Sequence, residues 1–273
     1  IAGTNNHVQV NVERVVARAI LTVEPKATTE GWPVNAKIAG VETQIATVTK
    51  VDYAVGQSNK KFFIMKKADY STPNPVYSYV PADAATWATN TNFDYSGLTD
   101  FTEALYWAYD ATNVSQPLNN EGTSKFVLPV THAVDKATPA EQRDSYKKGN
   151  TTYFEIRASF MPLLVDGVAP TFTVPTTVFL GANDNKFYST RALAEAQGQK
   201  ATEFKDGIMK YVLWLNPNSL VATVAEPNPM VSPTVRNQVY HAHVSEFLRM
   251  GVPNNQLDPN DPNDPNNPDN PID

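Results

Sequence analysis

The stretch TTYFEIRASFMP, residues 151–162, is the clearest indication of how this chain folds. Its central part, Thr152–Phe160, is rich in β-branched and aromatic residues, which favour strands. Similar stretches are IATVTKVDYAV at Ile45–Val55 and MKYVLWL at Met209–Leu215. We expect all three to form strands.

Further strands and turns complete this pattern. KFFIM at Lys61–Met65 and TFTVPTTVFL at Thr171–Leu180 have the same composition, and VQVNV at Val8–Val12 alternates so that three valines share a face. Turn-forming pairs such as Asp166-Gly167 and Asp206-Gly207 separate the strand-like stretches. Many short strands joined by polar turns are typical of sandwiches and barrels, so we expect a mainly β protein.

Helical signals are few. The apolar residues of VERVVARA, Val12–Ala19, would lie on one face of a helix. A second short helix is expected at Leu98–Tyr109, capped by Thr99 or Asp100, and a third at Arg191–Gly198. The polar region 69–116 as a whole is expected to hold loops and small helices.

Composition excludes several classes of protein. Hydrophobic residues make up 41% of the chain, which is enough for real cores, and the net charge of −6 argues against nucleic acid as a partner. The absence of cysteine excludes a disulfide scaffold and thiol catalysis. No apolar run approaches the roughly 20 residues that span a bilayer.

The chain ends in an acidic proline-rich segment, DPNDPNDPNNPDNPID, at 258–273. A period of three matches the turn of polyproline II, so its prolines would lie along one edge. Sixteen such residues reach roughly 50 Å at about 3.1 Å each, and we expect a semi-rigid spacer, with a solvated disordered tail as the alternative. The periodic prolines are Pro259, Pro262, Pro265, Pro268 and Pro271.

A domain boundary is expected near residues 146–150, where a charged segment precedes the strand at Thr152. This gives an N-terminal β-sandwich domain at 1–148, a C-terminal β-sandwich domain at 149–256 and the spacer at 257–273. No internal repeat is evident.

The histidines do not define a metal site. His241 and His243 lie two apart in a strand-like segment, so their side chains are expected to share a face. Two such histidines could begin a zinc site, but no third ligand is marked, and ordinary strand histidines are the favoured interpretation. His7 and His132 have no recognisable partner.

Catalytic motifs are also missing. No nucleophile elbow, phosphate loop or dinucleotide fingerprint occurs, and nothing selects a glycosidase pair among the 28 acidic residues. The four tryptophans could form a sugar-stacking platform, but core packing is favoured; Trp214 is expected in the core, and Trp87 is the best surface candidate. We therefore expect no enzyme, no cofactor and no metal. The other two tryptophans are Trp32 and Trp107.

Four stretches together resemble the type V fimbrillins, the pilins of Bacteroidales-type bacteria, and most of all their minor, short-fimbria type. In chain order they are VNVERVVARAILTV at 10–23, TTYFEIRASFMP at 151–162, FKDGIMKYVLWLNPN at 204–218 and VRNQVYHAHVSEFLRMGVP at 235–253. The last is the most specific, because it combines Arg236-Asn237, Tyr240 and a closing Gly251-x-Pro253.

The resemblance implies a fold of two Greek-key, transthyretin-like β-sandwich domains with a few short helices and a proline-rich C-terminal extension. It implies export through the outer membrane as a lipoprotein precursor, followed by proteolytic removal of an N-terminal strand. An extended C-terminal strand of the next subunit would fill the resulting groove, as in β-strand addition. The chain would then be the shaft subunit of a cell-surface fimbria that supports adhesion and colonisation.

The implied partners are copies of the chain, accessory, tip and anchor subunits, and host or bacterial surface proteins or glycans. Val8, Val10 and Val12 are candidates for the strand beside the acceptor groove, with ordinary core valines as the alternative. Because no alternating donor strand follows the spacer before Asp273, this sequence is expected to accept a strand but not to donate one, and to be monomeric in solution. The alternative functions are a tip or accessory adhesin and a secreted glycan-binding module.

Overall fold

The structure is a computed structural model of the whole chain. It describes residues 13–26, 28, 30–73, 89–132, 138, 140–141, 145–215 and 234–254. The expected strand at Val8–Val12, Trp87 and the periodic prolines of 258–273 lie outside these residues.

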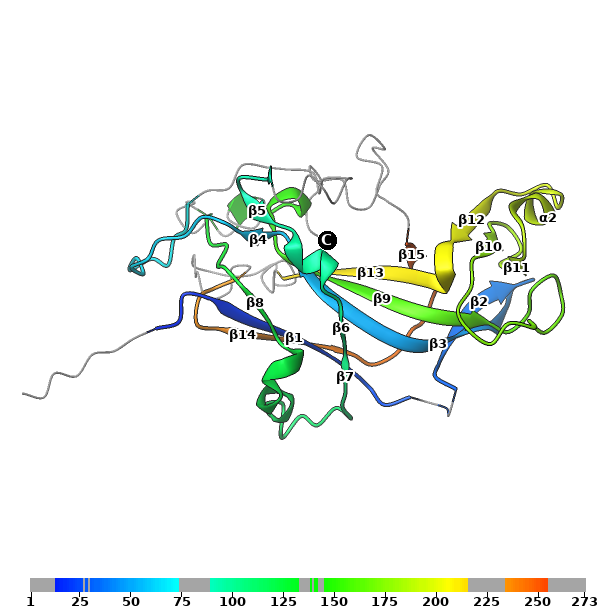
Figure 1. Cartoon of the computed structure of the whole chain (residues 1–273), viewed down its shortest axis with the longest axis horizontal. Coiled ribbons are helices and arrows are strands. Elements are labelled where there is room, and N and C mark those ends of the chain that lie inside the picture. Colours follow the sequence, from blue (N-terminus) through cyan, green and yellow to red (C-terminus); the bar gives the residue numbers. More distant parts are fainter. Residues whose placement is uncertain are drawn as a thin grey trace, which may run out of the picture.

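The larger sheet has the strand order β15-β13-β9-β3-β2, and β6 also pairs with β3. All pairs in it are antiparallel, and β9 lies at its centre with β3 on one side and β13 on the other (Figure 1). Three of its strands confirm the expectations for Ile45–Val55, Thr152–Phe160 and Met209–Leu215. Its strands are β2 Trp32–Ile38, β3 Val41–Gly56, β6 Thr102–Glu103, β9 Tyr153–Pro162, β13 Ile208–Trp214 and β15 Val252–Pro253.

The smaller sheet is built around β1 (Ala17–Val23). One side of β1 pairs with β14 (Val239–Val244) in parallel. Two short strands also pair with β1, namely β8 (Lys125–Val127) in antiparallel and β7 (Leu105–Tyr106) in parallel. The first and last long strands of the described chain are therefore neighbours.

Smaller elements cover the ends of these sheets. A three-stranded sheet and one short helix form one end of the molecule in Figure 1, and a two-stranded ladder lies toward the opposite end. The helix, α2, confirms the expectation at Arg191–Gly198, and Thr190 caps it by accepting a hydrogen bond from the Leu193 N–H. These elements are β10 Val178–Gly181, β11 Phe187–Tyr188, β12 Ala201–Phe204, α2 Arg191–Glu195, β4 Ser58–Asn59 and β5 Phe93–Asp94.

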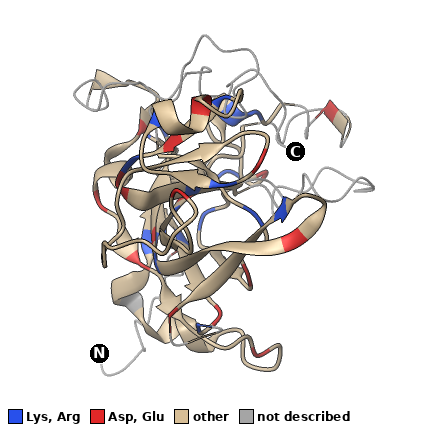
Figure 2. Ribbon diagram, turned by 90° about the vertical axis from the view of Figure 1, so that its right-hand side faces the viewer, with Lys and Arg blue, Asp and Glu red and all other residues tan. Residues whose placement is uncertain are grey.

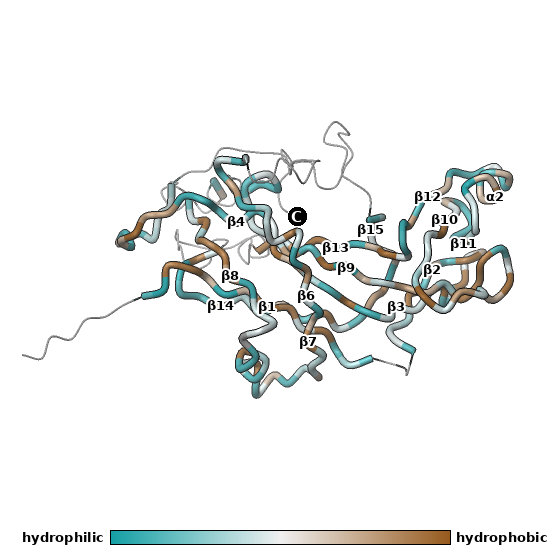
Figure 3. The backbone as a smooth tube through the Cα atoms, viewed as in Figure 1, coloured by the Kyte–Doolittle hydropathy of each residue, from teal (hydrophilic) through white to brown (hydrophobic). Residues whose placement is uncertain are grey.

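One main core lies between the two larger sheets. Leu21 and Val23 of β1 belong to the same buried cluster as Val51 of β3 and Phe154 and Phe160 of β9. Apolar residues recur along these strands in Figure 3, while residues of both charge signs are interspersed over the molecule in Figure 2. Alternate residues of each strand thus fill the space between two packed sheets, which confirms a mainly β, sandwich-type fold.

Four expectations of local structure were wrong wholly or in part. Val12–Ala19 is not a helix, because Ala17 begins β1, and Leu98–Tyr109 is replaced by a 3-10 turn followed by β6 and β7. Tertiary pairing with β1 and β3 overrides the helical pattern in both places. Lys61–Met65 is an exposed loop, and only the end of Thr171–Leu180 is a strand.

The expected boundary at 148/149 falls between two hydrogen-bonded neighbours, since β3 precedes it and β9 follows it in the same sheet. The main core likewise draws on residues from both sides, from Ala17 to Phe247. The division into two domains stays a prediction. Among the described residues, no helix is long and apolar enough to cross a membrane.

Candidate functional site: the open edge of β14

The strand β14 lies at an edge of the smaller sheet. Its residues pair with β1 from Arg18↔Val239 to Val23↔Val244, and no other described strand pairs with it. An edge strand with unpaired backbone groups is a template for another strand. The edge of β14 is therefore the first candidate for an assembly surface.

The two terminal hydrogen bonds of the β1–β14 pair fix which groups face outward. The Arg18 N–H donates to the Gln238 carbonyl at 2.9 Å, and the Glu24 N–H donates to the Val244 carbonyl at 2.8 Å. The backbone N–H and C=O groups of alternate residues point to the same side of a strand. The backbone groups of the even-numbered residues of β14 therefore point toward β1. The N–H and C=O groups of Val239, His241 and His243 face away, and no described backbone group bonds to them.

The inner face of this edge is apolar. Tyr240, Ala242 and Val244 pack against the main core but are only partly buried. The Tyr240 hydroxyl accepts a hydrogen bond from the Val235 N–H at 2.7 Å, and burial raises the pKa of Tyr240 to about 12. The edge therefore combines unpaired backbone with apolar side chains that an added strand would cover further.

The outer face of the edge carries both expected histidines. Thr22 of β1 lies between them, with its Oγ1 atom 2.7 Å from His241 Nε2 and 2.9 Å from His243 Nδ1. The second ring nitrogen of His243, Nε2, lies 3.1 Å from the Glu24 carboxylate. The indole ring of Trp107 covers both imidazoles, at centroid distances of 5.4 and 5.6 Å. The prediction that the two side chains share a face is confirmed.

This arrangement ties the edge strand to β1. Within the described part of the chain, no group of three or more His, Cys, Asp or Glu side chains could hold a metal ion. The Thr22 hydroxyl has one hydrogen, so it can donate to only one partner at a time, and the Ala242 carbonyl at 3.4 Å is a further acceptor beside the two imidazoles. Burial lowers the pKa of His241, and the nearby charge of His243 adds to this effect.

The larger sheet offers two less suitable edges. The pairing of β2 with β3 shifts in register between Val34 and Asn35, where Ile45 of β3 has no partner, and the Asn185 side chain donates to the Lys37 carbonyl of β2. Bulges and covering side chains are common protection against edge pairing. On the other side, β15 pairs with only Met209 and Lys210 of β13. The four residues of β13 that follow this pair, 211–214, form a shorter open stretch than the six of β14.

The tryptophans do not form a sugar platform in the described structure. Trp32 and Trp107 are buried, at 2% and 8% exposure, as core packing predicted. Trp214 is partly buried and packs against Tyr153 with ring centroids 4.9 Å apart. Val8, Val10 and Val12 lie outside the described residues, so their place beside a groove stays a prediction. Sequence reasoning identified β14 as a strand but gave no signal that it forms an edge.

The part of the chain that contains this edge is similar to a known class of fimbrial proteins. The family model described as "Major fimbrial subunit protein type IV, Fimbrillin, C-terminal" matches residues 202–270, a range that includes β13, β14 and β15. Its C-terminal part is thus similar to fimbrillins, which confirms the resemblance predicted from the motifs.

Within this class, the chain is similar to the minor fimbrium subunit Mfa1 of Porphyromonas gingivalis. Two such subunits are each 30% identical to it over 279 aligned residues. The alignments cover 94% of this chain and 51% of each relative, so the chain spans about half the length of the curated relatives it matches.

Proposed function

We propose that this protein is a structural shaft subunit of a cell-surface fimbria and that it accepts an extended strand of a neighbouring subunit along β14. The observation that carries the proposal is the open edge of β14, whose outward backbone groups have no partner among the described residues. The similarity to minor fimbrium subunits supports the same role.

The backbone of β14 supplies the affinity in this proposal. Val239, His241 and His243 each offer one outward donor and one outward acceptor. Each hydrogen bond to an incoming strand contributes a net free energy of about 0.5–1.5 kcal/mol, so a full ladder contributes several kcal/mol. Because a head-to-tail contact that does not close repeats indefinitely, such a ladder between copies makes a fibre.

The side chains of β14 supply the register. An incoming strand would place alternate apolar residues beside Tyr240, Ala242 and Val244, where the core is only partly covered. A shift of one residue would turn that strand's apolar face to solvent, which disfavours other registers. Export as a lipoprotein precursor, proteolytic removal of an N-terminal segment, tip and anchor subunits, and adhesion to host or bacterial surfaces belong to the same proposal.

A cysteine-protection experiment tests the location of the acceptor edge. The chain has no cysteine, so Val239→Cys gives a single thiol on β14. Val239 is 45% exposed, and Leu193 of α2, at 46%, provides the matched control as Leu193→Cys. Each substitution would be introduced into the gene of the producing bacterium, and maleimide labelling of the isolated monomer and of surface fibres would be compared.

The proposal predicts that fibre assembly slows labelling of Val239→Cys at least tenfold, because an added strand covers it, while labelling of Leu193→Cys changes little. Equal labelling of Val239→Cys in monomer and fibre would show that β14 is not the acceptor edge. Fibres that lack this protein altogether would overturn the shaft role.

A further inference from the structure

The loop at 60–67, KKFFIMKK, is the most exposed apolar segment that the structure describes, and we call it the basic loop. Ile64 and Met65 at its tip are 81% and 83% exposed, and Phe62 and Phe63 are 39% and 37% exposed. It projects from one end of the molecule, and its tip is apolar in Figure 3. A cluster of exposed large apolar side chains is unusual on a soluble surface and marks an interaction site.

Hydrogen bonds from several elements hold this loop in place. The Arg236 guanidinium donates to the carbonyls of Phe63 and Ile64 at 3.3 and 3.4 Å. The Lys61 N–H donates to the Asn59 side chain at 3.0 Å, and the Lys60 ammonium donates to the Asn90 carbonyl at 2.7 Å. The apolar tip is thus presented by a constrained backbone, which lowers the entropic cost of binding.

The loop concentrates positive charge on a chain whose net charge is −6. It contains four lysines, and one of them, Lys66, forms an ion pair with a described carboxylate, that of Glu13 at 2.7 Å. The Lys67 ammonium lies 4.0 Å from the centroid of the Phe63 ring, which places cation and aromatic ring side by side. The surface is therefore suited to a partner that is both acidic and able to pack on aromatic rings.

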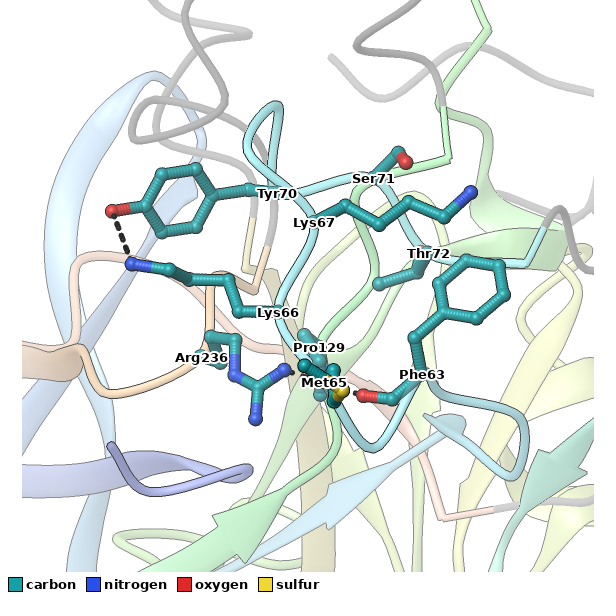
Figure 4. Close-up of a pocket in the computed structure, with 9 residues that line it drawn as sticks. All are labelled: Phe63, Met65, Lys66, Lys67, Tyr70, Ser71, Thr72, Pro129 and Arg236. Atoms are coloured by element: carbon teal, nitrogen blue, oxygen red, sulfur yellow. Dashed lines mark hydrogen bonds between the residues drawn. The ribbon is translucent and has the colours of Figure 1, made fainter. Parts of the chain in front are cut away.

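The hollow beneath the loop does not hold such a partner. It is lined by Phe63, Tyr70 and Arg236, among others (Figure 4), and its volume of ≈ 10 Å³ is about that of one water site. Arg236 is 8% exposed, and its buried Nε atom has no hydrogen-bond partner among the described residues, which such a water would satisfy. Recognition must therefore take place on the surface of the loop.

We propose that the basic loop binds the acidic proline-rich segment 258–273 of a second copy of this chain. That segment carries five aspartates and has a proline at every third position. Periodic prolines dock on aromatic surfaces in the polyproline II conformation, which matches Phe62, Phe63 and Tyr70. The aspartates match the lysines, so charge and shape both select this segment.

The position of the loop gives the proposal a directional consequence that rests on the proposed function. Arg236, which holds the loop, precedes the first residue of β14, Val239, by three positions. The basic loop therefore lies at the N-terminal end of the acceptor edge. A spacer bound there would lead into a donor strand that runs parallel to β14.

A titration with a synthetic peptide of residues 257–273 tests the contact. The full chain would carry three substitutions that remove competition by its own segment, and binding would be measured by NMR shifts at 50 and 300 mM salt. We expect saturable binding centred on the basic loop that weakens several-fold at the higher salt concentration. The three substitutions are Asp258→Asn, Asp261→Asn and Asp264→Asn.

Matched charge reversals separate a local contact from general attraction. Reversal of three loop lysines is expected to weaken binding about tenfold, because each exposed pair contributes modestly. Reversal of three exposed lysines near α2 changes the net charge equally and should leave binding within about twofold. The loop set is Lys60→Glu, Lys61→Glu and Lys67→Glu, and the control set is Lys186→Glu, Lys200→Glu and Lys205→Glu.

Several outcomes would overturn this inference. One is a lack of saturable peptide binding, and another is an equal loss of peptide affinity in both variant sets. A third is binding of phosphatidylglycerol vesicles without binding of the peptide, which would make the loop a membrane contact. Paramagnetic labels on the segment that broaden the loop only within the same molecule would exclude a second copy. Protection of Val239→Cys in fibres does not depend on these lysines, so the two proposals can fail separately.

Discussion

β9 and β14 are both alternating strands, but they have opposite relations to their surroundings. β9 is paired on both sides, with β3 and β13, and its residues Phe154, Ala158 and Phe160 are fully buried. β14 pairs with β1 alone among the described strands, and all of its residues are at least partly exposed. A central strand stabilises the sandwich, whereas an edge strand keeps backbone groups available for a partner.

The largest expected effect comes from the core of β9. Phe160→Ala should lower the free energy of unfolding by about 3–5 kcal/mol, because the ring packs against Phe187 and Phe204 and leaves a cavity. Urea unfolding followed by circular dichroism measures the change. The matched substitution on the edge strand, Val239→Ala, should lower the free energy of unfolding by less than about 1 kcal/mol. Similar losses of stability from the two substitutions would contradict the idea that β9 stabilises the sandwich more than β14 does.

Proline distinguishes the two sides of β14 itself. Ala242→Pro removes an N–H that faces β1, and we expect it to lower the free energy of unfolding by about 1–3 kcal/mol. Val239→Pro removes an outward N–H, which edge strands tolerate, so stability should change by less than about 1 kcal/mol while incorporation into fibres is lost. Thermal unfolding and immuno-electron microscopy measure the two results. Normal fibres from a folded Val239→Pro protein would speak against strand addition at this edge.

The strands of the larger sheet were predictable because their sequences are dense in apolar and β-branched residues. Lys61–Met65 has the same composition but is an exposed loop, because composition does not reveal whether another strand lies alongside. Whether a strand lies at the edge of a sheet also depends on residues far away in the sequence. The strand β14 pairs with β1, which lies more than two hundred residues earlier in the chain. The candidate site therefore required the structure, whereas most of the core did not.

Acidification probes the outer face of the β14 edge. The pKa of His241 is lowered in the folded chain by burial, whereas in the unfolded chain it is near 6.5. Below about pH 6.5 the unfolded state therefore binds a proton that the folded state resists, and stability is lost as pH falls. Urea midpoints of the wild type should decrease from pH 7.5 to pH 5, and His241→Gln should reduce that decrease. An identical pH dependence in both proteins would contradict this role of His241.

The smallest expected effect concerns the link between the two sheets. Arg249 follows β14 and pairs with Glu42 at the start of β3, with a shortest distance of 2.7 Å between side chains that are 57% and 46% exposed. Exposed pairs contribute little, so Glu42→Gln should lower the free energy of unfolding by less than about 0.5 kcal/mol. The Tyr211 hydroxyl, which donates to the Arg249 carbonyl at 2.6 Å, would still hold the connecting segment. A loss above about 2 kcal/mol in urea unfolding would show that the two sheets depend on this ion pair and not on their shared core.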